Sequence, residues 1–358
     1  MHALRIYAGP QARRHLEQQG LSPSDVGVVP GAAGGPKGLV LGPLDRFLFG
    51  DWLSRSSQPV DLVGASIGAW RAATACLSRP AEALATLERE YIHQHIDLPP
   101  GQRRLTADQI SAGFADHLRR FFGGRTGEIL GHPRFRLHVV AARGRRLLAR
   151  DGRWRTPMGY LAAYAANAAS RRALGQWLER VVFSAGQAPL PFEPGDFPTH
   201  QAPLTDANFM EALQASCSIP FLLKPVVDIP QAPAGVYWDG GITDYHLHLC
   251  YRSSADAPIV LYPHFQRAVV PGWLDKAWRH RHRATAALDW TVVVAPDPDW
   301  VSRLPNGKLP DRSDFTRYGQ DVRARAKVWS TAVAQAQRLA DEWAQWLEHP
   351  DPSRVEPL

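Results

Sequence analysis

VDLVGASIGAWRAATACL, residues 60–77, is the stretch of sequence that decides the fold. Its first six residues are apolar except for Asp61, as in a buried strand, and the alanine-rich residues after Ser66 predict a helix. Gly64 and Gly68 flank Ser66, as a sharp strand-to-helix turn requires, because larger side chains there would collide with neighbouring elements. Such a turn sets the Ser66 hydroxyl at a helix N-terminus, where free N–H groups favour negative charge. We therefore expect Ser66 to be a nucleophile and the N–H of Ile67 to face the oxyanion.

A second strand–loop–helix unit precedes this turn. Residues 24–48 read SDVGVVPGAAGGPKGLVLGPLDRFL. Gly34 and Gly35 can direct their N–H groups toward an oxygen without obstruction by side chains. Lys37 adds a positive charge near the same point, and Gly38 follows it. The competing interpretation is a phosphate-binding loop, which needs Ser or Thr after the lysine in a GxxxxGK[ST] spacing. We expect this segment to supply the oxyanion hole of a hydrolase.

The third segment lies far downstream, where Asp239, Gly240 and Gly241 follow the apolar residues 236–238. An isolated Asp-Gly-Gly is most often an ordinary turn. Beside the first two segments, however, Asp239 becomes the leading candidate for the general base. A free aspartate, with a pKa near 3.9, is a poor base for a hydroxyl. Asp239 should therefore be partly buried and hydrogen-bonded to Ser66.

These three segments resemble the patatin-like phospholipase family of lipid acyl hydrolases over roughly residues 24–250. That family pairs a glycine-rich loop ending in a basic residue and glycine with a GxSxG serine and an Asp-Gly-Gly or Asp-Gly-Ala aspartate. A further stretch, ASCSIP at residues 215–220, is similar to the segment that family members carry shortly before the aspartate. The matching positions are Gly34, Gly35, Lys37, Gly38, Gly64, Ser66, Gly68, Asp239, Gly240 and Gly241.

The resemblance implies an α/β fold, with a three-layer α/β/α sandwich around a mostly parallel central sheet. It also implies hydrolysis of fatty-acyl esters by a Ser66–Asp239 dyad, without histidine, cofactor or metal. The partner would be a fatty-acyl ester or phospholipid, and the acyl-enzyme could also pass its acyl group to an alcohol. The chain departs from the family at residues 242–246, Ile-Thr-Asp-Tyr-His, where relatives run toward an Asn-Pro pair, and Pro36 and Ile67 are also less usual. These departures leave the acyl-chain preference open.

The rest of the chain alternates short β-branched runs with helical stretches, which is typical of an α/β protein with buried strands. We expect one hydrolase domain over residues 1–310, with a helical region at about 103–180 inserted, and a C-terminal segment 311–358. An apolar stripe predicts a single helix over about 314–347 that packs on the core. The expected strands are residues 4–8, 26–29, 60–65, 136–142, 181–185, 258–262 and 291–295, and the expected helices are residues 36–49, 66–77, 80–92, 106–121, 157–177, 206–217 and 273–287.

Composition narrows the class of protein. With 358 residues, of which 45% are hydrophobic, the chain can bury a sizeable core. Its three cysteines form no CxxC pair, which argues against a disulfide scaffold or a cysteine-based zinc site and fits a cytoplasmic setting. No signal-peptide core or apolar run long enough to span a membrane is expected.

Positive charge is concentrated in the middle of the chain. Between Arg103 and Arg180 there are sixteen arginines and five acidic residues, a local net charge of +11, whereas the whole chain carries +7. Such a region could contact an anionic membrane surface or another polyanion, or it could be a solvated helical face. No nucleic-acid-binding module is present, so nucleic acid is not an expected partner. A basic membrane- or polyanion-binding protein with an inactive hydrolase core is therefore an alternative.

Histidines define two further alternatives. An α/β-hydrolase with a Ser-Asp-His triad would have its histidine after the aspartate, and the candidates are His246, His248, His264, His280 and His282. Closely spaced histidines can also bind a metal, and the pairs with suitable spacing are His93/His95, His246/His248 with Asp244, and His280/His282. Locally hydrogen-bonded histidines are the simpler interpretation of each pair.

Overall fold

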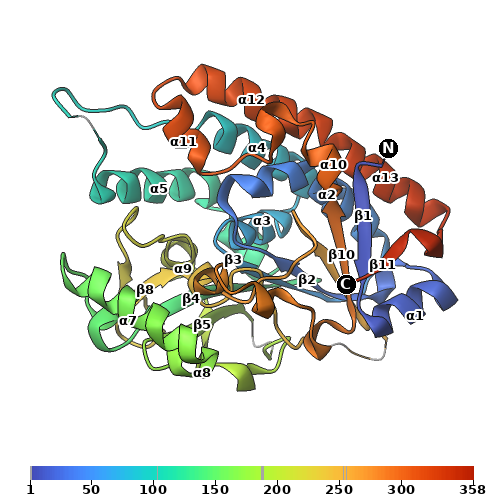
Figure 1. Ribbon diagram of the computed structural model, residues 1–358, viewed down its shortest axis with the longest axis horizontal. Coiled ribbons are helices and arrows are strands. Elements are labelled where there is room, and N and C mark those ends of the chain that lie inside the picture. The colour runs from blue at the N-terminus through green and yellow to red at the C-terminus, as the bar shows by residue number, and fades with distance from the viewer. Residues whose placement is uncertain (1, 103, 187–188, 253, 255) are drawn as a thin grey trace.

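The computed structural model describes residues 2–102, 104–186, 189–252, 254 and 256–358 (Figure 1). Within these residues one mixed, mostly parallel sheet has the order β11-β1-β10-β9-β2-β3-β4-β5-β6, with β8 paired to β4 and β7 paired to β8. Its strands are β1 Leu4–Ala8, β2 Val26–Gly31, β3 Val60–Ala65, β4 Phe135–Gly144, β5 Leu178–Ala185, β6 Thr199–Leu204, β7 Val226–Val227, β8 Val236–Asp239, β9 Ile259–Pro263, β10 Thr291–Pro296 and β11 Val355–Pro357.

Helices flank this sheet, so the expected α/β fold with a mostly parallel central sheet is confirmed. The α-helices are α1 Pro10–Gln19, α2 Gly42–Phe47, α3 Ile67–Ala75, α4 Pro80–His93, α5 Ala107–Phe122, α6 Thr126–Leu130, α7 Arg155–Ala169, α8 Arg171–Leu174, α9 Phe209–Ser216, α10 Pro298–Val301, α11 Ser313–Tyr318, α12 Val322–Gln335 and α13 Gln337–Glu348.

The two faces of the central strands are covered differently. Side chains on one face of these strands, such as Leu62 and Val139, belong to a large core shared with helices that include α2, α3, α4 and α9. Side chains on the opposite face, such as Val63 and Val140, pack against the segment that follows β8, including Leu247. Buried side chains on both faces explain why these strands are continuous apolar runs. The covering segment begins immediately after the predicted general base.

The C-terminal segment forms three helices where a single helix was expected. Gly319, with a φ of 51°, separates α11 from α12, and α12 ends at Gln335 immediately before α13. The predicted apolar stripe is nevertheless buried, with Trp329 and Trp343 both fully enclosed. Figure 1 shows α12 and α13 beside α4 and α2, on which they pack. The stripe therefore serves core packing.

Two other helix predictions were only partly right. The segment 273–287 forms three short 3-10 turns instead of a helix, and its Asp275 accepts hydrogen bonds from Arg281 and Asn167. These side-chain contacts hold Asp275 in place at the end of the first turn. The stretch 157–177 is divided into α7 and α8 at Ser170, whose backbone is extended and whose hydroxyl caps α8.

The arginine-rich middle, expected to be an inserted helical region, contains helices α5 to α8 and also strand β4 and the first residues of β5. Its first arginine, Arg103, lies outside the described residues. In the part of the chain that the structure describes, no helix combines the length and apolar character needed to cross a bilayer.

Candidate active site

Ser66 occupies a strained turn between β3 and α3. Its φ of 56° and ψ of −128° lie in a region that residues with a side chain rarely adopt. The turn fits only because Gly68 lacks a side chain, since a Cβ there would overlap the carbonyl oxygen of Gly31 at the end of β2. The sequence pattern therefore predicts the local geometry correctly: a strand end, a sharp turn and a helix start.

Strand β4 brings the serine and the aspartate together. β3 runs parallel to β4 and ends with Ala65 opposite Val140. β8 runs antiparallel to β4 on the same side, and its last residue, Asp239, lies opposite Ala141. The two strands therefore approach each other end to end along one neighbour. At this junction the Ser66 Oγ donates a hydrogen bond of 2.8 Å to Asp239 Oδ2.

The stretch 215–220 positions both members of the pair. The N–H of Ser66 donates to Ser216 Oγ at 2.9 Å, and the Ser216 hydroxyl donates to the Val140 carbonyl at 2.6 Å. The N–H of Asp239 donates to the Ser218 carbonyl at 2.9 Å. The sequence resemblance pointed to this stretch without a role for either serine. In the structure this stretch ties Ser66 to β4 through Ser216 and holds the backbone of Asp239 through Ser218.

The carboxylate of Asp239 is buried and oriented. One oxygen faces Ser66, and the other accepts the N–H of Gly241 at 2.7 Å. Burial raises the pKa of Asp239 above its usual value, and the positive charge of Arg312 and the Ser66 hydrogen bond partly offset this rise. A raised pKa makes the carboxylate a better proton acceptor at neutral pH. Ser66 and Asp239 are 4% and 5% exposed, so an ester must enter the protein surface to reach them.

The predicted oxyanion loop follows β2 and runs beside the Ser66 turn. The N–H of Ala33 donates to the Tyr245 carbonyl at 2.9 Å, which ties this loop to the segment after Asp239. Gly35 has a φ of 56°, which favours glycine. Within the described residues, the N–H groups of Gly34, Gly35 and Ile67 have no hydrogen-bond acceptor. They remain available to a substrate oxygen.

Lys37 lies over a phenyl ring. Its Nζ is 5.2 Å from the centroid of the Phe265 ring, which also packs against the backbone of Gly34. Burial lowers the pKa of Lys37. This cation–π contact holds the loop against Phe265.

Two cations that the sequence did not identify complete the surroundings. Lys276 Nζ lies 3.9 Å from the centroid of the Tyr245 ring, and partial burial together with Arg312 lowers the pKa of Lys276 to about 8. The Arg312 Nε is 3.3 Å from the position that a Cβ on Gly35 would occupy. Both cations lower the pKa of Asp239. Neither lies in a recognisable motif, and both are distant in sequence from the residues that they face.

The candidate triad histidines do not complete a triad. His246 and His264 are buried side by side, with ring centroids 4.4 Å apart, and each bonds backbone groups through Nδ1. Burial lowers the pKa of His264 to about 3 and that of His246 well below its usual value. His248 bonds the Val269 carbonyl and Thr285. No described histidine forms a hydrogen bond with the carboxylate of Asp239.

The histidine pairs considered as metal ligands also have local partners. His282 Nε2 bonds the backbone of Asp275, and His95 pairs with Asp97. Among the described residues, no three His, Cys, Asp or Glu side chains gather where they could share a metal ion.

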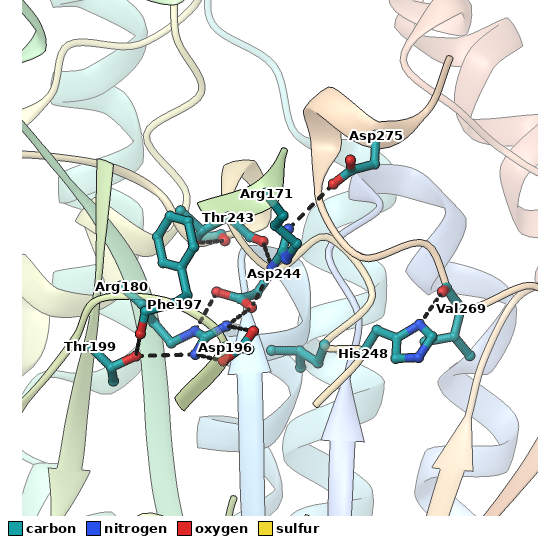
Figure 2. A network of polar contacts seen from close by, with 12 residues as sticks. Arg171, Arg180, Asp196, Phe197, Thr199, Thr243, Asp244, His248, Val269 and Asp275 are labelled. Atoms are coloured by element: carbon teal, nitrogen blue, oxygen red, sulfur yellow. Dashed lines mark hydrogen bonds and ion pairs between the residues drawn. The ribbon is translucent and has the colours of Figure 1, made fainter. Parts of the chain in front are cut away.

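A buried ion-pair network anchors the segment after the aspartate (Figure 2). Arg180 of β5 donates to both oxygens of Asp244 at 2.8 and 2.6 Å, and both side chains are fully buried. Arg180 also binds Asp196 at 2.9 Å, and Arg171 donates to the Thr243 carbonyl at 2.7 Å. Asp244, one of the departures from the family pattern, is thus an anchor for the turn beyond Asp239. Arg171 and Arg180, both from the arginine-rich middle of the chain, therefore help to hold this turn in place.

A known family covers the part of the chain that contains these residues. A family model described as patatin-like phospholipase matches residues 34–246, a span that begins at the predicted oxyanion loop and contains Ser66 and Asp239. A search of curated proteins found no significant match. Among solved structures, the crystal structure of VipD from Legionella pneumophila aligns with 95% of this chain and 70% of VipD, at 14% identity and a TM-score of 0.31.

Proposed function

Because this chain belongs to the patatin-like phospholipase family, we propose that it hydrolyses fatty-acyl esters of lipids through a Ser66–Asp239 dyad. The observation that carries the proposal is the 2.8 Å hydrogen bond from Ser66 Oγ to a buried carboxylate oxygen of Asp239. A serine hydroxyl needs such an acceptor before it can attack a carbonyl carbon. The free N–H groups beside it supply the second requirement, stabilisation of an oxyanion.

The proposed reaction has two halves. In the first, Asp239 takes the Ser66 proton while Oγ attacks the ester carbonyl, and the N–H groups of Gly34, Gly35 and Ile67 bind the oxyanion. The C–O bond of the ester then breaks, the departing alcohol takes the proton from Asp239, and an acyl-enzyme remains. In the second half, Asp239 deprotonates a water that attacks the acyl carbon, and the fatty acid leaves as Ser66 recovers its proton.

The chemistry is tested first by covalent labelling. A fluorophosphonate should add one adduct to the intact wild-type protein, and peptide mapping should locate it on Ser66. The exposed Ser302 gives a matched control: Ser302→Ala should be labelled like the wild type, and Ser66→Ala should not be labelled. A panel of p-nitrophenyl esters of increasing chain length, run beside phospholipids and lysophospholipids, then identifies the substrate class. Labelling of another residue, or no turnover of any ester, would contradict the proposal.

The pH dependence of kcat/KM gives an independent prediction. Since the base acts as a carboxylate, activity should rise with pH through the pKa of Asp239, with a midpoint above the ordinary value of 3.8. Among the positive charges that lower the pKa of Asp239, that of Arg312 has the largest effect. Arg312→Met should therefore raise the pKa of Asp239 and move the acid limb of the kcat/KM profile to higher pH. Arg317→Met, in the neighbouring α11, should leave the limb in place. An unchanged limb in Arg312→Met would show that another group controls it.

A further inference from the structure

Exposed hydrophobic side chains gather in one part of the surface. Ten large hydrophobic side chains of the described residues are exposed, and seven of them come from residues 147–164 and 221–222. Trp154, the N-cap residue of α7, and Met158 and Leu161 within this helix follow one another at helical spacing and are 72%, 60% and 70% exposed. We call the whole set the apolar patch; its members are Leu147, Trp154, Met158, Leu161, Tyr164, Phe221 and Leu222. Contiguous exposed apolar surface of this kind marks an interaction site.

The two segments of the apolar patch are neighbours. The ring of Tyr160, on the buried side of α7, lies 5.7 Å from that of Phe221 and 5.7 Å from that of Trp238. Trp238 immediately precedes Asp239, and Phe221 follows Ser218, whose carbonyl holds the Asp239 backbone. Figure 1 shows α7 at the outer left edge of the molecule, next to α8. The apolar patch therefore borders the strand that carries the proposed base.

Four exposed arginines come from the same stretch of chain as α7 and its preceding loop, and we call them the arginine rim. Arg146, Arg150, Arg153 and Arg155 are exposed, and within the described residues none of them forms an ion pair with a carboxylate. The Arg153 guanidinium lies 5.6 Å from the Trp154 ring, so charge and apolar surface adjoin directly. The nearby Asp151 is engaged by Thr156 and Lys224. The rim consequently keeps its positive charge.

We propose that the apolar patch and its arginine rim dock the protein on an anionic phospholipid surface. This inference rests on the proposed function, because a lipid acyl hydrolase gains access to its substrate at such a surface. A helix with tryptophan, leucine and methionine on one face and arginines beside them has the character of an interfacial helix. A second copy of the chain fits poorly, since two positively charged rims would face each other across the interface. The basic charge fits anionic headgroups instead.

Vesicle co-sedimentation tests the docking. The wild-type protein should bind vesicles of phosphatidylcholine with phosphatidylglycerol and bind pure phosphatidylcholine more weakly. Met158→Ser/Leu161→Ser should lower the partition coefficient at least about tenfold. Trp290→Ser removes an exposed aromatic outside the apolar patch and should bind like the wild type. Arg150→Ser, Arg153→Ser and Arg155→Ser should each lower binding to anionic vesicles by about fivefold, and high salt should mimic them.

Activity on a soluble ester separates docking from catalysis. Met158→Ser/Leu161→Ser should hydrolyse monomeric p-nitrophenyl butyrate within about twofold of the wild type, yet lose activity on vesicle substrate in proportion to lost binding. Vesicle binding without any ester hydrolysis would keep the docking and overturn the proposed function. The docking is overturned if the wild type ignores vesicles, if Trp290→Ser loses as much binding, or if the patch variants change only the oligomeric state in solution.

Discussion

Ser66→Ala is expected to lower kcat for a fatty-acyl ester by about 10⁴- to 10⁶-fold, because it removes the hydroxyl that would form the acyl-enzyme. The change removes one hydroxyl that points at Asp239 and leaves the N–H of Ser66 free to bond Ser216. Steady-state kinetics on a p-nitrophenyl ester, with circular dichroism to verify the fold, measures the effect. Ser302→Ala provides the matched control and should retain full activity.

Asp239→Asn probes the other member of the proposed dyad. The asparagine can keep the bond from the Gly241 N–H, but it cannot accept the serine proton, so kcat should fall by about 10²- to 10⁴-fold. Because the two residues act as a unit, the double variant should be little worse than Ser66→Ala alone. If the losses instead multiplied, or if His246→Phe abolished turnover as completely as Ser66→Ala, the dyad would be wrong.

Asp244→Ala is expected to have the largest effect on stability. It leaves the fully buried Arg180 guanidinium without its main partner, and breaking a buried pair in this way costs about 3–5 kcal/mol of unfolding free energy. Urea denaturation measures the loss. Asp116→Ala, which breaks the exposed ion pair with Arg119, is the matched control and should cost less than about 1 kcal/mol.

A second variant distinguishes an unpaired charge from lost packing. Arg180→Met/Asp244→Leu removes both charges and keeps apolar volume in their place, so it should recover much of the stability that Asp244→Ala loses. If Arg180→Met/Asp244→Leu is as unstable as Asp244→Ala, the stability lost in Asp244→Ala comes mainly from lost packing and hydrogen bonds, and not from the unpaired charge of Arg180.

The sequence predicted the local backbone geometry around Ser66 better than it predicted which distant residues meet at the site. Strand, turn and helix around Ser66 follow from glycines whose spacing has a steric cause, and burial on both sheet faces explains why the central strands were recognisable. Ser216 and Arg312 were not assigned roles, because a serine that holds a backbone N–H and a charge that faces a carboxylate leave no pattern in their own segments. The missed turns of 273–287 have the same origin, since Asp275 is fixed by tertiary contacts.

The family resemblance does not extend to every residue near the candidate site. Lys276 and Arg312, whose charges lower the pKa of Asp239, lie outside residues 34–246. Part of the surroundings of Ser66 and Asp239 therefore comes from a region of the chain in which the sequence shows no family pattern.

β3 and β8 meet end to end along β4. The proposed chemistry therefore depends on the register with which each strand pairs with β4, and not on the separation of Ser66 and Asp239 in the sequence. A one-residue slip of β8 would turn the carboxylate to the opposite side of the sheet and disconnect the pair. By contrast, a change of length in a loop that makes none of these contacts would leave both pairings untouched. The pairing opposite Val140 and Ala141, and not the length of chain between Ser66 and Asp239, therefore sets the geometry of the pair.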